Sequence, residues 1–517
     1  MKTLFSLRYA ALAAAAFSAV SCSKFLDVNV SPNSPVAVPP TVQLPSILIG
    51  TGFVVGNTLG RDGDLFMQHY AGLANQPATE DRYAISGNYD NEWQFDLYGN
   101  NLNGAQTLIA STQAASPAYS GIAKLIKAYN FSLLTDLWGD VPYSQALQGL
   151  GNIHPGVDRQ QDIYEGTDKI QSLFALVREG LADLDKASLL TPGTDDVVYK
   201  GTLSKWKKAG NMLLLKFANT ISRKDPALAT SVINEVLDKG AGGSAAIAAN
   251  ADDFSVPFGT TVGNTNPFYS YNVTNRPDDQ MASVRFLDSL AVYRDPRLPK
   301  YFTTTPGNAN STETTTFGKF TGYDNGSNAT PPARTANPLT TGRSVYNTYV
   351  LGTGYVFGGT AGGDAPVRLL TNFQRAFILA ESAITLKTAG DANSLFQEGI
   401  RRSMEETGIA TADIDAYFAA NPAIVTLRGT DAHKVGQIIR QKWMASVGNG
   451  LDSYNDYRRT GYPRLQPALN VSFTPNIPQR LLYPPSEVSG NGANMPTVNI
   501  TTKVWWANNT ASPYYAN

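Results

Sequence analysis

The sequence predicts a mainly α-helical protein with little β-structure and long irregular loops. From about Gln43 onward, apolar residues recur three and four positions apart over much of the chain, which is the spacing of one face of an α-helix. Two of these stretches follow each other closely and predict a helical hairpin, and one long segment rich in Thr, Gly, Asn and Pro interrupts the pattern. With 42% hydrophobic and 10% aromatic residues, the composition is that of a globular protein.

The N-terminus predicts a secretion signal and a lipid anchor. Lys2 and Arg8 precede an apolar run that ends in small residues and is shorter than the roughly 20 apolar residues of a membrane span. The only cysteine, Cys22, follows Ser-Ala-Val-Ser at the expected cleavage point, which is similar to the lipobox of a bacterial lipoprotein. We therefore expect residues 1–21 to be a signal peptide and Cys22 to be lipidated. The alternative is ordinary cleavage that leaves a free thiol.

Residues 22–40 carry this cysteine and then four prolines, which prevent a regular helix and predict an extended tether. An arm packed against the body is the alternative. Loss of residues 1–21 would leave 39 Lys and Arg residues against 42 Asp and Glu, a net charge of −3, and this disfavours a nucleic-acid partner. The remaining length allows one large domain or several small ones.

Apolar stripes predict individual helices. They cover about 170–184, 202–221, 372–388, 395–404 and 434–447, with Thr202 or Ser204 as an N-cap of the second. The alanines at 376, 380 and 383 allow close approach in the hairpin 372–404, as in the helix pairs of tetratricopeptide-like solenoids. Trp93, Trp138, Trp206 and Trp443 lie on or at the ends of predicted helices, so we expect them in the core.

The loop-rich insertion covers about 303–367 and is the expected place for ligand or partner contacts, because long loops in compact proteins are often functional. Sugar binding needs aromatic faces beside polar groups, and peptide binding can use the same aromatics. The candidate ligand-binding residues are Tyr269, Tyr271, Asn272 and Arg276, then Tyr346 and Tyr349 in the insertion, and Tyr83 and Tyr89. The alternative is that these rings fill the body.

The sequence offers little enzymatic chemistry. His69, His154 and His433 lie far apart without metal-ligand spacing, and no nucleophile elbow or phosphate-binding loop is found. We expect no metal, no cofactor and no enzyme activity, while a pair of carboxylates assembled by folding keeps a hydrolase as an alternative. Arg61-Asp62-Gly63-Asp64 lacks the spacing of a calcium loop and predicts a turn or a helix cap. Residues 454–459 predict a polar network that braces the C-terminal segments.

Several ordered stretches together resemble the SusD/RagB family, in its SusD-like branch, of nutrient-binding outer-membrane lipoproteins of Bacteroidetes. They are FLDVNVSPNSP after Cys22, QHYAG at 68–72, NEWQFDLYGNNLNGAQTLI, AYNFSLLTDLWGDVPYSQAL at 128–147, GTLSKWKKAGNMLLLKFANTIS at 201–222, LDSYNDYRRTGYPRL at 451–465, RLLYPPSEVSGNGANMP at 480–496, and Val504-Trp505-Trp506. The residues after Cys22 lack the acidic run associated with surface export in some members.

This resemblance implies a tetratricopeptide-like helical-hairpin scaffold with irregular loops, forming a single domain over residues 41–517. It also implies a lipid-anchored protein of the outer membrane, facing outside, that captures oligosaccharides or peptides and passes them to a SusC-like TonB-dependent transporter. Two alternatives stay open at this point. One is a surface hydrolase of glycans or peptides, and the other is a structural or adhesive lipoprotein without a small ligand.

Overall fold

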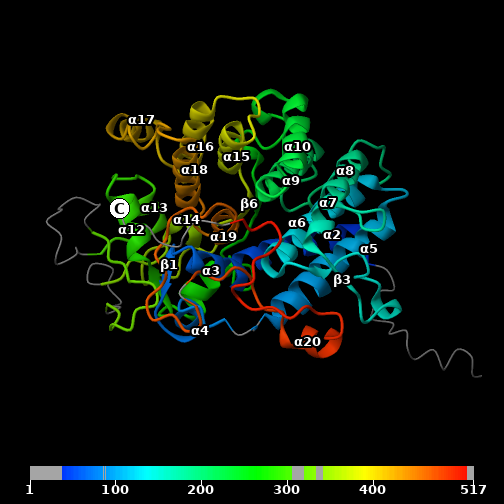
Figure 1. Cartoon of the computed structure of the whole chain (residues 1–517), viewed down its shortest axis with the longest axis horizontal. Helices are drawn as coiled ribbons and strands as arrows, with labels where there is room; N and C mark the ends of the chain where they lie inside the picture. Colours follow the sequence, from blue (N-terminus) through cyan, green and yellow to red (C-terminus); the bar gives the residue numbers. More distant parts are fainter. Residues whose placement is uncertain are drawn as a thin grey trace, which may run out of the picture.

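The computed structural model describes residues 38–85, 87, 89–305, 319–332, 342–474 and 476–508. Helices dominate these residues, and the strands are short, which confirms the predicted fold class (Figure 1). The expected signal peptide, Cys22 and nearly all of the tether lie outside the described residues, as do parts of the loop-rich insertion.

The main elements follow in chain order. They are α2 (Pro40–Gly56), α3 (Thr58–Phe66), β1 (Tyr70–Gly72), α4 (Asn75–Glu80), η1 (Asn91–Leu102), α5 (Asn103–Thr112), α6 (Pro117–Trp138), β2 (Val141–Pro142), η2 (Gly149–Gly151), β3 (Val157–Asp158), α7 (Gln160–Glu165), α8 (Leu173–Asp183), α9 (Leu203–Ile221), α10 (Pro226–Lys239), η3 (Ala241–Gly243), η4 (Asn250–Asp252), β4 (Phe254–Val256), α11 (Pro267–Tyr269), η5 (Ser270–Asn275), β5 (Gln280–Ala282), α12 (Val284–Ala291), α13 (Leu298–Tyr301), α14 (Thr348–Leu351), β6 (Val367–Leu370), α15 (Asn372–Thr385), α16 (Ala392–Glu406), α17 (Thr411–Ala420), α18 (Asp431–Ala445), α19 (Gly450–Thr460) and α20 (Pro485–Asn491). η1 and η5 are π-helical, and the other η elements are 3₁₀ turns.

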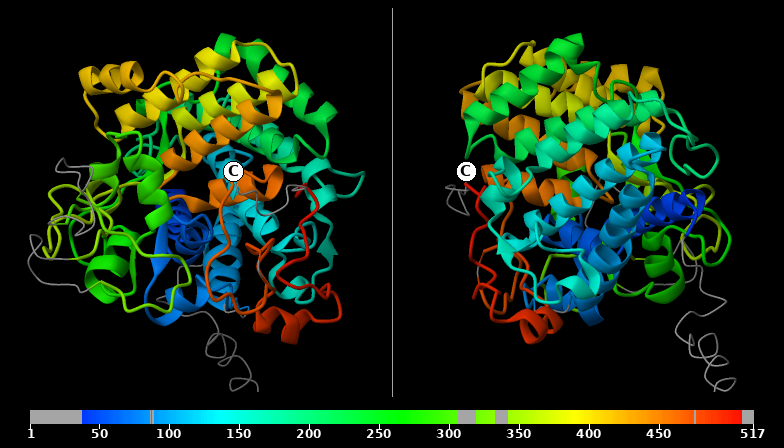
Figure 2. Two further views of the ribbon diagram at one scale, coloured as in Figure 1. Left: turned by 60° about the vertical axis from the view of Figure 1, so that its left-hand side comes forward. Right: turned by 90° about the vertical axis from the view of Figure 1, so that its right-hand side faces the viewer.

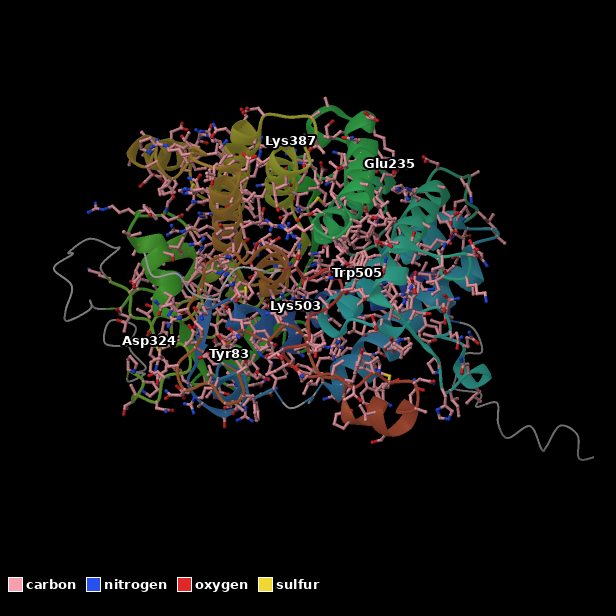
Figure 3. All side chains as sticks on the ribbon, viewed as in Figure 1. Tyr83, Glu235, Asp324, Lys387, Lys503 and Trp505 are labelled. Atoms are coloured by element: carbon pink, nitrogen blue, oxygen red, sulfur yellow. The ribbon has the colours of Figure 1, made fainter. Side chains whose placement is uncertain are left out.

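One layer of the molecule consists of paired helices, α8 to α10 and α15 to α18, and it lies at the top of Figures 1 and 2. The predicted hairpin is present as α15 and α16, which pack along each other. A Cβ at Gly399 of α16 would lie 2.6 Å from the ring of Phe377 in α15, so this glycine permits the close contact. Figure 3 shows Glu235 and Lys387 on this layer and Tyr83 in the layer below.

Local sequence signals fix where these helices begin. α8 starts at Leu173, three residues later than the stripe suggested, because the Ser172 hydroxyl caps it by accepting from the Ala175 N–H. α9 has Thr202 at the N-cap position, as expected, although its side chain makes no capping bond. Thr371 and Gln374 form a capping box at the start of α15.

The other layer surrounds α2, α3, α6 and α19. The run Pro40–Phe66, which covers α2 and α3, is long and apolar enough to cross a membrane, but more than half of its most apolar stretch is buried inside the protein, as for a core helix. α6 is almost wholly buried, and its last residue, Trp138, donates to the Leu482 carbonyl. All four tryptophans predicted to lie in the core are at most 3% exposed.

The strands form three separate antiparallel pairs. β1 pairs with β5, β2 with β3, and β4 with β6, and each pair joins segments that are distant in the sequence or flank a loop. They fasten the loop segments to the helices and do not build a sheet core.

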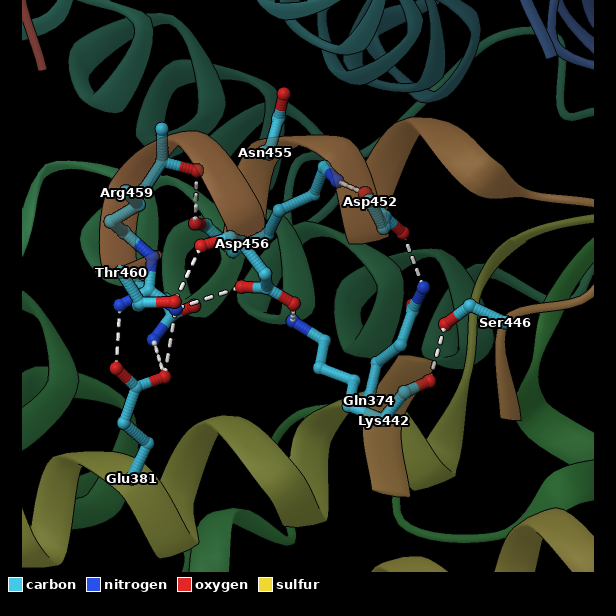
Figure 4. Close-up of polar contacts among 12 residues, drawn as sticks. Gln374, Glu381, Lys442, Ser446, Asp452, Asn455, Asp456, Arg459 and Thr460 are labelled. Carbon is cyan, nitrogen blue, oxygen red and sulfur yellow. Dashed lines mark hydrogen bonds and ion pairs between the residues drawn. The ribbon is translucent and has the colours of Figure 1, made fainter. Parts of the chain in front are cut away.

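A buried polar network joins α9, α15, α18 and α19, which confirms the predicted brace (Figure 4). Arg459 of α19 donates to both oxygens of Glu381 in α15 and to Asp456, and Lys442 of α18 pairs with Asp456 at 2.9 Å. Lys216 of α9 pairs with Asp452 at the other end of α19. Separating these buried charges would leave each one without a partner in the protein interior, which is costly. The network therefore holds the two layers in one relative orientation.

Candidate functional site

Five of the tyrosines predicted to contact a ligand lie in the core. Tyr83, Tyr89, Tyr269, Tyr346 and Tyr349 are 1–6% exposed. The hydroxyls of Tyr89, Tyr269 and Tyr346 donate to groups inside the protein, and the Tyr83 hydroxyl accepts from the Ala468 N–H at 3.0 Å. The Tyr349 ring lies 3.8 Å from the Arg368 guanidinium. Rings enclosed in this way leave no face for a sugar in this conformation. For these five residues the structure therefore agrees with the alternative given above, that the rings fill the interior of the protein.

The remaining residues of the first candidate cluster keep exposed surface. Tyr271 and Asn272 are half-buried on η5, and Arg276, just after it, is exposed. The Arg61 guanidinium lies 3.9 Å from the Tyr271 ring centre, and the Tyr271 hydroxyl donates to Asp279 at 3.2 Å. Burial raises the pKa of Tyr271, so this hydroxyl is a donor at neutral pH.

Helix α3 brings the three predicted tyrosine segments together. Its Arg61 stacks on Tyr271, its Asp62 accepts from Tyr89 at 2.7 Å, and its Asp64 accepts from Tyr346 at 3.0 Å. The expectation of a turn or cap at these residues is therefore wrong, because they form the interior of a fully buried helix. The three segments converge on a structural hub.

The carboxyl groups of this hub are perturbed by burial. Burial raises the pKa of Asp62 to about 6, against the opposing hydrogen bonds from Glu80 and Tyr89. Burial and the nearby Asp62 charge also raise the pKa of Glu80 well above its usual range. Asp64 lies 2.6 Å from the Nδ1 atom of His69, whose Nε2 faces the Trp443 carbonyl at 3.0 Å. These groups connect α3 to α4 and α18 and have no solvent-exposed side chain among them.

A groove of about 550 Å³ opens between η1, the loop after β2 and the start of α20. We call it the Tyr98 groove. Its lining residues combine aromatic, apolar and polar groups: Trp93, Gln94, Tyr98, Asn103, Pro142, Leu147, Pro155 and Glu487. Its volume is in the roughly 300–1,000 Å³ range of small-molecule sites.

The π-helical turns of η1 position the aromatic wall of this groove. The Trp93 and Tyr98 ring centres lie 5.2 Å apart, and the Tyr98 hydroxyl donates to the Pro142 carbonyl at 2.6 Å. The Trp93 indole N–H donates to Glu487 at 3.1 Å, and Asn491 donates to the other oxygen of this carboxylate at 2.9 Å. The rings are thereby fixed in place, and Tyr98 is half-buried where it lines the groove.

The polar groups of the Tyr98 groove are of the kinds that can form hydrogen bonds with sugar hydroxyls. Gln94 and Asn103 are exposed amides, each with donors and an acceptor, and both line the groove. Such an arrangement can bind a neutral, hydroxyl-rich ligand against a ring. This site could not be predicted from the sequence, because Trp93 and Glu487 are 394 residues apart and only the fold brings them together. In the described part of the chain no group of three or more His, Cys, Asp or Glu side chains could hold a metal ion.

Comparison with known proteins identifies the family. A family model described as "Starch-binding associating with outer membrane" matches residues 32–484, and the chain therefore belongs to the SusD-like family. This confirms the resemblance read from the sequence, and the family supports a carbohydrate-binding role at the outer membrane. Comparison with curated protein sequences finds no match.

Solved structures share the fold over nearly the whole chain. A chitin-binding protein has 26% sequence identity and a TM-score of 0.75, with 91% of this chain and 100% of that chain covered. A SusD homolog from Bacteroides uniformis has 22% identity and a TM-score of 0.71, covering 90% and 99%. A chitin-binding SusD homolog from Flavobacterium johnsoniae has 21% identity and a TM-score of 0.71, covering 92% and 100%.

Proposed function

We propose that this protein is a lipid-anchored binding protein of the outer membrane that captures neutral oligosaccharides and passes them to a SusC-like TonB-dependent transporter. Family membership supports the carbohydrate class, and the pattern around Cys22 supports the lipid anchor. The outward-facing position rests on the family resemblance alone, because the residues after Cys22 lack the acidic run found in some surface-exported members. One structural relative at 26% identity is a chitin-binding protein, which favours glycans over peptides as the ligand.

The observation that carries the proposal is the Tyr98 groove. It presents the half-buried Tyr98, two exposed amides and apolar proline and leucine side chains on one concave surface. A pyranose has an apolar face and a hydroxyl rim, so the Tyr98 ring contacts the face while Gln94 and Asn103 bind the rim. Tyr271, Asn272 and Arg276 form a second candidate contact, because they retain exposed surface on η5.

Calorimetric titration tests this assignment. The chain from Cys22 onward, carrying Cys22→Ser, is titrated with chitotriose, maltotriose and a tripeptide, and then as the double variant Gln94→Ala, Asn103→Ala. Phe95→Ala is the matched control, since Phe95 is 55% exposed on the same helix and does not line the groove. We expect one of the sugars to bind wild type, and the double variant to lose about tenfold or more in affinity, on the order of two lost hydrogen bonds.

Other outcomes separate the alternatives. If Tyr271→Ala abolished binding and the double variant Gln94→Ala, Asn103→Ala did not, the site would lie on η5. Binding of the tripeptide only would change the ligand class, and release of shortened sugars would identify a hydrolase. Binding of neither class to wild type would contradict capture and favour a structural or adhesive role.

Transfer to a transporter is supported by exposed apolar side chains beside the Tyr98 groove. Leu150, Ile153 and Val488 are 98%, 65% and 50% exposed, and α20 packs on the neighbouring loop through the bond from Asn491 to the Pro155 carbonyl. These three residues belong to the two segments that border the groove, and exposed apolar side chains that lie together are typical of protein contacts. We expect Leu150→Asp with Ile153→Asp to weaken co-purification with the transporter and to leave sugar affinity unchanged, whereas unaffected co-purification would remove this surface from the proposal.

A further inference from the structure

A second groove, of about 730 Å³, lies between α12, α18 and the segment 462–466. We call it the Arg440 groove. It shares no lining residue with the Tyr98 groove, and α12 and α18 lie far from α20 in Figure 1. Its basic lining residues are Arg285, Arg440, Arg464 and His433, and no Asp or Glu lines it.

Two of these arginines are oriented by uncharged groups. Arg285 donates to the Gln466 carbonyl at 2.6 Å, and the Arg440 guanidinium lies 5.3 Å from the ring centre of Tyr293. In the described part of the chain neither Arg285 nor Arg440 forms an ion pair with a carboxylate. The buried Arg297 and Arg459 contrast with them, because each is paired with Asp or Glu. Within the residues that the structure describes, the charges of Arg285 and Arg440 are therefore not neutralised by an ion pair.

The start of α18 adds to this positive potential. Thr430, Ala432 and His433 line the groove, and the Thr430 hydroxyl caps the helix by accepting from the His433 N–H at 3.3 Å. A helix N-terminus carries a partial positive charge. Asp431, in the same turn, is exposed and pairs with Lys387 at 3.2 Å and Lys434 at 3.8 Å, so two lysines balance its charge.

An aromatic ring lies beside the arginines. Tyr462 is half-buried and packs against Gly436 of α18. The glycine permits this contact, because a Cβ at position 436 would lie 3.0 Å from the Tyr462 ring. The exposed Arg464 lies 5.5 Å from the centre of the same ring. The groove thus combines an aromatic surface with planar guanidinium donors.

We propose that the Arg440 groove binds acidic oligosaccharides, with a carboxylate or sulfate group held by Arg440, Arg464 and Arg285 and a sugar ring placed against Tyr462. Guanidinium groups match the geometry of carboxylate and sulfate oxygens by donating two parallel bonds. The size of the groove, in the roughly 300–1,000 Å³ range of small-molecule sites, is that of an oligosaccharide site. This proposal does not depend on the Tyr98 groove, because the two ligands differ in charge and the two sites share no residue.

Titration with two acidic probes tests the proposal and separates the two kinds of anion. The full mature chain with Cys22→Ser is titrated with trigalacturonate, a sulfated chondroitin tetrasaccharide, maltotriose and a tripeptide with a free carboxylate. Arg440→Gln is compared with Arg401→Gln, whose guanidinium also stacks on a ring, Phe418, at 4.1 Å but lies outside the groove. Both variants lose one positive charge.

We expect at least one acidic sugar to bind wild type, about tenfold or more weaker binding by Arg440→Gln, and unchanged binding by Arg401→Gln. The exposed Arg464→Gln serves if Arg440→Gln fails to fold, and binding should weaken as salt rises. The proposal is overturned if neither acidic sugar binds, if the tripeptide alone binds, if both arginine variants lose affinity equally, or if Arg440→Gln and Arg464→Gln bind like wild type. Loss of maltotriose binding alone, with acidic-sugar binding unchanged, would concern only the Tyr98 groove and would contradict the role of Arg440 proposed here.

Discussion

Replacement of Glu381 by leucine is expected to destabilise the protein strongly, because it removes the carboxylate that neutralises a buried arginine. Glu381 is 2% exposed and accepts from both terminal nitrogens of Arg459, which is 1% exposed. In the variant, Arg459 keeps Asp456 at 2.7 Å as its charged partner, and the Asn219 amide loses an acceptor at 3.2 Å.

The magnitude follows from the burial of this pair. Removing one partner of a buried ion pair costs about 3–5 kcal/mol, whereas a surface pair contributes about 0–1 kcal/mol. Glu235 is a matched control, because it also pairs with an arginine, Arg178 at 2.7 Å, but the two side chains are 30% and 43% exposed (Figure 3). We expect Glu381→Leu to lower the free energy of unfolding by about 3 kcal/mol or more and Glu235→Leu by about 1 kcal/mol or less.

Urea unfolding followed by circular dichroism at pH 7 measures both variants. Equal shifts of the two midpoints would refute the reasoning. The pH dependence provides a second check: burial opposes ionisation of Glu381, but the Arg459 charge outweighs it and lowers the pKa of the carboxyl below 4.5. The stabilisation is then present above pH 4.5 and is lost as the pH falls further, so the difference between wild type and Glu381→Leu should shrink in acid.

Two further changes have defined outcomes. Burial raises the pKa of Asp62 from 3.8 to about 6, so its contribution to stability is present below pH 3.8 and is lost as the pH rises through 6. The free energy of unfolding of Asp62→Asn relative to wild type should therefore be higher at pH 8 than at pH 4, by on the order of 2 kcal/mol. Thermal unfolding at both pH values measures this difference, and the same pH dependence in both proteins would contradict it. Gly450→Ala should cost about 3 kcal/mol, because its Cβ would lie 2.2 Å from the Asp64 nitrogen and 2.3 Å from the Gly63 carbonyl carbon. Gly490→Ala is the control, because no atom lies within 4 Å of its Cβ, and its free energy of unfolding in urea should equal that of wild type. If Gly450→Ala and Gly490→Ala lowered the free energy of unfolding equally, steric overlap would not be the cause.

The helices and their burial could be predicted from local sequence, whereas the site could not. The apolar stripe and the alanines of 372–404 report directly on a face that packs against a neighbouring helix, and α15 and α16 form there. In irregular segments no such period exists, so Tyr269 and Tyr346 looked like exposed aromatic residues. Their acceptors are the Thr360 carbonyl and Asp64, which are 91 and 282 residues away and which only the fold brings near.

A second reason concerns α3. From the sequence alone, its Arg61, Asp62 and Asp64 predict a turn or a helix cap, because charged residues are rarely buried without partners. The partners are present, but Tyr89, Tyr271 and Tyr346 come from three other segments. A short polar stretch can therefore form a buried helix when aromatic residues from distant segments donate hydrogen bonds to its carboxylates and stack on its arginine.

The central claim is that a neutral oligosaccharide binds in the Tyr98 groove, and a crystal structure of the mature chain with the sugar selected by titration tests it most directly. We expect a sugar ring against the exposed part of Tyr98, with hydroxyls within hydrogen-bonding distance of Gln94 and Asn103. Sugar bound on η5 against Tyr271, with the Tyr98 groove empty at saturating ligand, would contradict the claim.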